Sequence, residues 1–281
     1  MDKKQFRSAI FRAIDELHDL GYELPDSLKR RDKREPGRDL KESIEDRLMM
    51  TVRRYFKKQK KEIEDRLRQS YPERDGGVSP IAPPDKPVSV DDLIAGETDD
   101  EFMSGIIRLV GLATTGGVNL FKDAITVGMD YTLVNEQALD FARNYSYELI
   151  NKNKGGIDAT TRDRVSNAIS RFIETPGYTL RDISRDLEPI FGLERARQIA
   201  ITETTRAFAE GNKLAGEELA KEYPDVKVIK TWFTNNDDRL CDICLLNDGE
   251  DVELHEAFPS GDDAPPAHVG CRCWMTTSTK I

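Results

Sequence analysis

The 281-residue chain contains few aromatic residues, no cysteine before position 241 and no long uninterrupted apolar segment. Aromatic residues make up 7% of the chain and hydrophobic residues 38%, whereas charged residues make up 33%. This composition argues against a compact all-β enzyme and favours a helix-rich, highly soluble protein. No stretch reaches the roughly 18 apolar residues of a transmembrane helix, and the charged start of the chain is no secretory signal. We therefore expect a cytoplasmic protein, or one in an assembly built in the cytoplasm.

Charge is divided unevenly along the chain. The formal net charge is −10, yet residues 1–71 carry 20 Lys and Arg against 15 Asp and Glu, so the amino-terminal part is basic and the remainder acidic. Six cations gather within nine positions: Arg53, Arg54, Lys57, Lys58, Lys60 and Lys61. This basic run is suited to contact phosphates or an acidic protein surface, and it is equally compatible with a solvated helix face.

The amino-terminal region is predicted to be an arm followed by a spacer. Apolar residues recur at helical spacing in 3–20 and 39–70, which predicts two amphipathic helices. Residues 72–87 contain five prolines and two glycines, which cannot continue a helix. We therefore predict a basic helical arm at 1–71 and a Pro/Gly-rich linker at 72–97.

A helical middle region is predicted at 98–158. Thr98 and Glu101 have the spacing of a capping box, which places a helix start there. Because glycine weakens a helix, the pair Gly116-Gly117 predicts an interruption, with another helix from about 121 to 149.

The remaining residues, 159–281, are predicted to form a domain of three helices and two strands. The helices are expected at about 159–174, 179–190 and 193–222, the second opened by Thr179 and Asp182 and the third stopped by Pro224. The strands are expected at 226–234 and 273–279, where β-branched and aromatic residues nearly alternate with others.

Five potential metal ligands lie between and beside these two strands. They are Cys241, Cys244, His268, Cys271 and Cys273. A Cys-x2-Cys turn presents two thiolates to one ion, and Cys-x-Cys on an extended segment points both sulfurs to one face, so the pattern predicts zinc (Zn2+). Two disulfides are the alternative, which an intracellular location disfavours.

The predicted zinc site has one ligand more than a tetrahedral ion needs. One of His268, Cys271 or Cys273 is then a bystander or a supporting group, and our preferred set is Cys241, Cys244, His268 and Cys273. A site closed by four protein ligands is structural, because catalysis requires an open position for water. The predicted fold class is therefore α+β and predominantly α-helical, with a small carboxyl-terminal zinc-stapled β-hairpin and a zinc loop at 232–281.

Several strings in the carboxyl-terminal part resemble the phage Mu F-like minor head protein family, also called the phage head morphogenesis domain. They are ARQIAITETTRA at 196–207, Gly211, WFT at 232–234, DRLCDIC at 238–244, Asp248-Gly249 and PPAHVGCRC at 265–273. The resemblance covers residues from about 160 to 281. It implies a minor capsid protein of a tailed bacteriophage, located in the head interior or at the portal vertex of the virion. The implied partners are the portal protein and other head proteins, and the basic run is a candidate contact for packaged DNA.

Other functional classes are compatible with some of the same residues. In an enzyme, such as a zinc-dependent nuclease or an ejected effector, the metal would be catalytic and His268, Asp237 or Asp238 would act as a base. Arg239 and Arg272 flank the metal loop, where they either bind a carboxylate or phosphate or brace the hairpin. A nucleic-acid-binding module is disfavoured, because residues 232–281 are acidic overall. We expect an assembly protein without catalytic residues or turnover.

Overall fold

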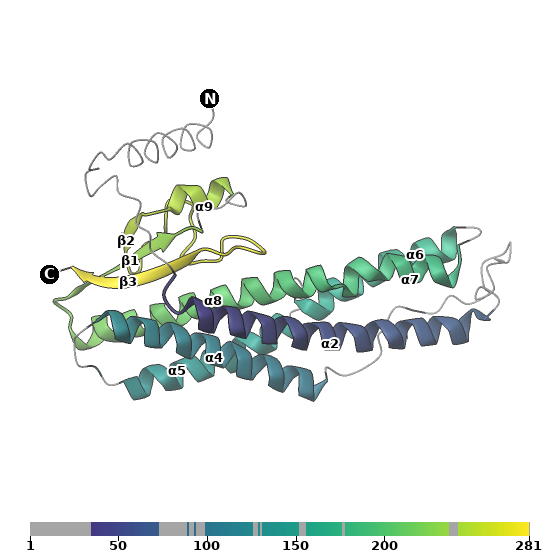
Figure 1. Cartoon of the computed structure of the whole chain (residues 1–281), viewed down its shortest axis with the longest axis horizontal. Coiled ribbons are helices and arrows are strands. Elements are labelled where there is room, and N and C mark those ends of the chain that lie inside the picture. Colours follow the sequence, from purple (N-terminus) through teal and green to yellow (C-terminus); the bar gives the residue numbers. More distant parts are fainter. Residues whose placement is uncertain are drawn as a thin grey trace, which may run out of the picture.

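The computed structural model describes residues 35–72, 89, 93, 99–125, 129, 131–151, 156–175, 178–235 and 241–280. The helix expected at 3–20 and nearly all of the linker expected at 72–97 lie outside these residues. Within them, long helices form an elongated body, and a small sheet with one short helix sits on one side of it (Figure 1). The predominantly helical fold agrees with the prediction, but the antiparallel sheet has three strands instead of two.

Helix α2, Arg38–Ser70, is an integral part of the helical body. It packs against α4, α7 and α8 and buries one face in the core that these helices share. Its fully buried apolar residues are Ile44, Leu48, Val52, Phe56, Ile63 and Leu67. The Tyr55 ring also stacks on Phe102 of α4, with centroids 3.9 Å apart. Residues 38–70 therefore share a core with the helices that follow, while the domain boundaries drawn from the sequence stay a prediction.

Helix α4, Asp100–Ala124, runs without interruption through Gly116 and Gly117, so the predicted break at this pair is wrong. A Cβ atom on Gly117 would lie 2.1 Å from the carbonyl oxygen of Phe208 in α8. These glycines therefore permit close contact between two helix backbones and do not end the helix. The helix starts at Asp99, whose side chain accepts hydrogen bonds from the backbone N–H groups of Glu101 and Phe102.

Four further helices complete the body: α5, Tyr131–Asn151; α6, Ile157–Glu174; α7, Leu180–Phe191; and α8, Leu193–Glu222. The last three confirm the predictions closely, whereas the helix expected from 121 to 149 is divided between the end of α4 and α5. Thr179 and Asp182 form the predicted capping box. Helix α8 holds much of the body together, since it contacts α2 and α4 extensively and also reaches the sheet.

The sheet contains β1, Lys227–Phe233; β2, Asp251–Glu253; and β3, Trp274–Lys280, in the order β2-β1-β3. The two predicted strands are β1 and β3, and they pair antiparallel with Thr231 opposite Thr276. Strand β2 and the short helix α9, Asp242–Asn247, were not expected from the sequence. The chain between β1 and β3 passes through α9, then β2, and returns in a long loop, so both ligand-bearing segments lie beside the central strand.

Among the described residues, one helix has the length and apolar composition of a membrane-spanning helix. Helix α4 is long and apolar enough by length and composition, but 56% of its most apolar window is buried inside the protein. The core of the helical body accounts for this apolar character, because Ile106, Leu109 and Val110 are all at most 2% exposed.

Candidate metal centre

The five predicted ligands come from two segments that meet beside β1. Cys241 and Cys244 lie at the start of α9, where Cys241 is the N-cap and its sulfur accepts a hydrogen bond from the Cys244 N–H at 3.3 Å. The other three, His268, Cys271 and Cys273, occupy the loop that leads into β3. All four cysteines are free thiols.

Cys244 lies at the centre of the cluster. The side chains form two triads, one of Cys241, Cys244 and His268 and one of Cys244, Cys271 and Cys273, and the ligand atoms within each triad lie within 4.8 Å of one another. The Cys244 sulfur is 3.4 Å from His268 Nε2 and 3.6 Å from the Cys271 sulfur. Tetrahedral zinc, with bonds of about 2.3 Å to sulfur and about 2.0 Å to nitrogen, keeps neighbouring ligand atoms about 3.5 to 3.8 Å apart. The donor set and its spacing therefore fit such an ion.

Cys271, which our preferred set left out, is well placed to be a ligand. It is 1% exposed, and hydrogen bonds from Cys244 and Cys273 lower the pKa of its thiol to about 2. Backbone N–H groups of Cys273 and Ala267 add to this effect. The pKa of Cys244 is raised, chiefly because its thiol donates a hydrogen bond to Cys271. A buried thiolate surrounded by donors is the protonation state that a metal ion selects.

Aromatic residues pack against the triad of Cys244, Cys271 and Cys273, and a cavity borders both triads. Trp232 and Phe258 form an edge-to-face pair with centroids 5.1 Å apart and pack against Cys244, Cys271 and Cys273. A cavity of about 190 Å3 lies between the first turns of α8 and the ligand loop, and all five candidate ligands line it. Its walls include Arg197, Gln198, Asn235 and Arg272.

A family model described as Phage Mu protein F like protein matches residues 160–276. Residues 160–276, here called the Mu F-like segment, are therefore similar to the phage Mu protein F-like family. The match contains β1, β2, the start of β3 and all five candidate ligands, and it confirms the resemblance found in the sequence. No curated protein and no solved structure matches the chain. This similarity suggests a phage head morphogenesis protein, because the family is generally structural.

Within the Mu F-like segment, a hydrogen bond connects the loop that bears His268, Cys271 and Cys273 directly to α8. The Gly270 N–H, located between His268 and Cys271, donates a hydrogen bond of 2.8 Å to the Thr202 hydroxyl of α8. Gly270 has a positive φ of 76°, a conformation that favours glycine. Asn235 holds the same loop from the other side, since its side-chain amide donates to the Arg272 carbonyl at 3.0 Å.

Glu203 and Arg206 of the Mu F-like segment pair locally, as their spacing predicts. The Arg206 Nε atom lies 3.5 Å from Glu203 Oε2, and Tyr145 of α5 donates a hydrogen bond to the same oxygen. Burial raises the pKa of Glu203. The guanidinium also lies 5.7 Å from the centre of the Tyr145 ring. This group therefore joins α8 to α5.

Of the other candidates named from the sequence, Arg272 lines the cavity beside the cluster. Asp237, Asp238 and Arg239 lie outside the described residues. His255, the other histidine of the carboxyl-terminal part, is exposed and belongs to neither triad. No short signal in the sequence identified the supporting residues Thr202 and Asn235, because each acts on a partner far away along the chain.

The basic run lies on α2, outside the Mu F-like segment, and half of its cations are paired within the protein. Lys58 contacts Asp99 at 2.6 Å, Lys60 contacts Glu188 at 2.5 Å, and Arg54 approaches Glu101 at 3.9 Å. Lys57 and Lys61 are exposed, and Arg53 is partly exposed. The positive surface offered to an outside partner is thus smaller than the sequence suggests.

Proposed function

We propose that this protein is a minor head protein of a tailed bacteriophage, located in the virion and acting at or near the portal during head assembly, without catalytic turnover. The match of residues 160–276 to the Mu F-like family carries this proposal. The candidate metal centre supports it, because five ligands gathered in one small module provide enough donors to close a structural ion.

In this proposal, zinc is held by four of the five clustered side chains, with Cys244 and Cys271 among them. Bound zinc supplies a structural clamp that joins the start of α9 to the loop before β3. The chain's own residues then keep the module in place: Thr202 binds the Gly270 N–H, and Trp232 and Phe258 pack against Cys244, Cys271 and Cys273. A three-stranded sheet this small buries little apolar surface, so such a clamp contributes directly to its folding.

The partners proposed are the portal protein and other head proteins. For packaged DNA, the contact is offered by Arg53, Lys57 and Lys61, the cations of the basic run on α2 that form no ion pair within the described part of the chain. Three cations make a weak and salt-sensitive attraction to phosphates, and they read no base sequence. We therefore propose protein partners as the primary ones.

A co-assembly experiment tests this function. The full chain would be co-expressed with the portal and capsid proteins encoded by the same genome, and particles would be purified and their composition measured. We expect the protein to copurify with portal-containing particles and to be lost from particles that lack the portal. Equal recovery with and without the portal would argue against a role at the portal. Hydrolysis of DNA or RNA that requires metal and disappears in a folded His268→Ala variant would overturn the non-catalytic assignment.

A further inference from the structure

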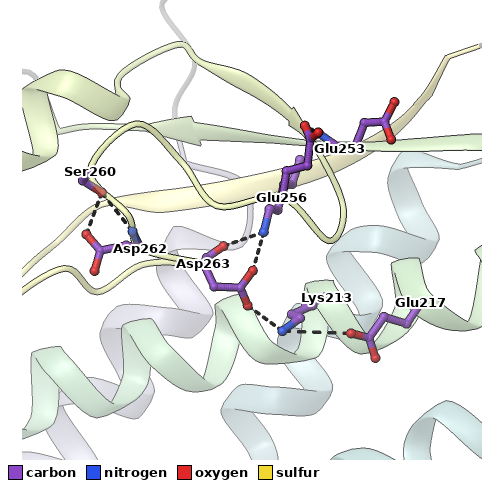
Figure 2. Close-up of polar contacts among 8 residues, drawn as sticks. Lys213, Glu217, Glu253, Glu256, Ser260, Asp262 and Asp263 are labelled. Carbon is purple, nitrogen blue, oxygen red and sulfur yellow. Dashed lines mark hydrogen bonds and ion pairs between the residues drawn. The ribbon is translucent and has the colours of Figure 1, made fainter.

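Asp263 lies in the long loop between β2 and β3, where two lysines from different elements share its carboxylate. Lys230 of β1 places its Nζ atom 2.5 Å from Oδ1 and 2.8 Å from the Asp263 carbonyl oxygen. Lys213 of α8 places its Nζ atom 2.5 Å from Oδ2 (Figure 2). One loop residue is therefore attached both to the central strand and to the longest helix.

The Lys230 ammonium makes this attachment obligatory. Its side chain is 0% exposed, and among the described residues its recorded polar contacts are those with Asp263. The Phe258 ring lies below it, with its centre 5.2 Å from Nζ. A buried ammonium is tolerated only when it is paired, so the position of Lys230 fixes the position of Asp263. Burial opposes ionisation of Asp263, but the two ion pairs outweigh it and lower the pKa of this carboxyl.

The anchor at Asp263 is followed almost at once by the candidate ligands. Only four residues separate it from His268, and two of them are the buried prolines Pro265 and Pro266. Proline restricts the backbone, so displacement of Asp263 is transmitted along this short link instead of being absorbed by it. Beyond His268, the hydrogen bond from Gly270 to Thr202 provides a second attachment to α8.

The same loop is also tied to the segment that bears Cys244. Asn247, three residues after Cys244, donates its side-chain amide to the Ser260 hydroxyl at 2.7 Å and accepts the Ser260 N–H at 3.0 Å. Ser260 in turn donates to Asp262, next to Asp263 (Figure 2). Contacts around Asp263 therefore connect α8, β1 and both ligand-bearing segments.

We infer that Asp263 is a positioning residue for the metal centre, because its two ion pairs hold the segment from 264 to 273 in the place where His268, Cys271 and Cys273 meet Cys244. This inference rests on the proposed metal site. Asp263 itself is not a ligand, since it belongs to neither triad. Asp263 increases the extent to which the ligand geometry is formed before zinc binds, and it thereby increases the affinity for zinc.

The test measures zinc affinity in the full-length chain. Metal-free protein would be titrated with Zn2+ against a chromophoric chelator for the wild type, Asp263→Asn, Lys213→Met and a control, Glu256→Gln, which alters an exposed carboxylate of the same loop. We expect Asp263→Asn to bind zinc about tenfold more weakly, as is typical for residues that orient metal ligands. Lys213→Met should have a smaller effect, because Lys230 still holds Asp263, and Glu256→Gln should have none.

A spectroscopic measurement separates positioning from a general loss of stability. With Co2+ as the probe, absorption from thiolate and imidazole ligands should change in Asp263→Asn and stay unchanged in Glu256→Gln, while the unfolding midpoint of the helical body stays that of the wild type. If Asp263→Asn does not fold, the pair Lys230→Met with Asp263→Asn removes both charges and should fold with the same weakened affinity.

The outcomes distinguish this inference from the function on which it rests. A wild-type chain that binds no zinc refutes the metal site, and the inference falls with it. If the wild-type chain binds zinc and the folded Asp263→Asn variant has an affinity within about twofold of it, the metal site stands. The positioning role of Asp263 is then overturned.

Discussion

Asn212 of α8 accepts two hydrogen bonds from Thr277 of β3, one from the backbone N–H at 3.1 Å and one from the hydroxyl at 2.8 Å. Its side-chain amide donates to the Gly117 carbonyl of α4 at 3.1 Å. Asn212 is 3% exposed and Thr277 is 2% exposed, so neither can turn to water instead. One side chain therefore joins the helical body to the sheet that carries the candidate metal centre.

Replacing Asn212 with alanine should destabilise the protein by about 2 to 4 kcal/mol, because it leaves buried donors and an acceptor without partners. Chemical denaturation followed by circular dichroism would measure the loss. Ser278→Ala, at an exposed neighbouring position of β3, is the matched control and should change stability by less than about 0.5 kcal/mol. A similar small loss for both variants would contradict the role given to Asn212.

A second prediction concerns the crossing of α4 and α8. In Gly117→Ala the new Cβ would lie 2.1 Å from the carbonyl oxygen of Phe208, and in Gly211→Ala it would lie 1.9 Å from the carbonyl oxygen of Thr114. Relief of either clash requires the two helix backbones to separate. We expect each variant to lose about 3 kcal/mol or more. Gly111→Ala is the control, since its Cβ would meet Ala142 at an ordinary 3.6 Å and alanine favours helix. That variant should be as stable as the wild type or slightly more stable.

These glycines also show where sequence reasoning reached its limit. A capping box such as Thr179 and Asp182 is local, so the start of α7 could be predicted, and Pro224 likewise marked the end of α8. A glycine pair has two opposite meanings, a helix break or a close helix crossing, and only the partner helix distinguishes them. The partners of α2 could not be predicted for the same reason, since the apolar stripe from Ile44 to Leu67 does not indicate which helices it packs against.

The candidate metal centre, too, could be predicted from the sequence only in part. The spacing of Cys241, Cys244, His268, Cys271 and Cys273 was enough to predict that they gather, because the chain between β1 and β3 must bring its ends together. The supporting contacts were invisible, since Lys230 and Asp263 are 33 positions apart and carry no motif. Elements as short as β2 and α9 exist through such contacts, and no periodicity reveals three residues of strand.

A third prediction uses the pH dependence of Glu45 in α2. Burial, assisted by the charges of Glu35 and Glu42, raises the pKa of Glu45 from 4.5 to about 7, although Lys41 opposes this. Between these values the folded state keeps a proton that the unfolded state releases, so stability falls as the pH rises from about 4.5 to 7. Glu45→Gln should therefore be more stable than the wild type by about 2 kcal/mol at pH 8 and equally stable at pH 4. Unfolding midpoints at both pH values would check this, with Glu62→Gln, an exposed position on α2, as the control.

A fourth prediction concerns limited proteolysis. The proline-rich sequence at 72–87 suggests a first cut there, which divides the chain into two fragments. Because α2 buries Leu48, Val52 and Phe56 against α4, α7 and α8, we expect the fragments to stay associated. Size-exclusion chromatography of the digest should give one peak that contains both fragments. Elution of a separate amino-terminal fragment under native conditions would show that the core contacts of α2 are weaker than the structure implies.

The last prediction concerns the metal and the order of importance of its ligands. Elemental analysis should find about one zinc ion per chain, and chelation should make the segment from 241 to 273 more susceptible to protease while the helical body resists. Cys244→Ser should have the largest effect, because Cys244 belongs to both triads, and Cys271→Ser should exceed Cys241→Ser, because Cys271 is 1% exposed whereas Cys241 is only partly buried. His255→Ala is the control and should bind zinc as the wild type does. A chain that holds less than about a tenth of an equivalent of metal, or thiol variants that match the control, would leave the cluster without a metal and would remove the clamp from the proposed function.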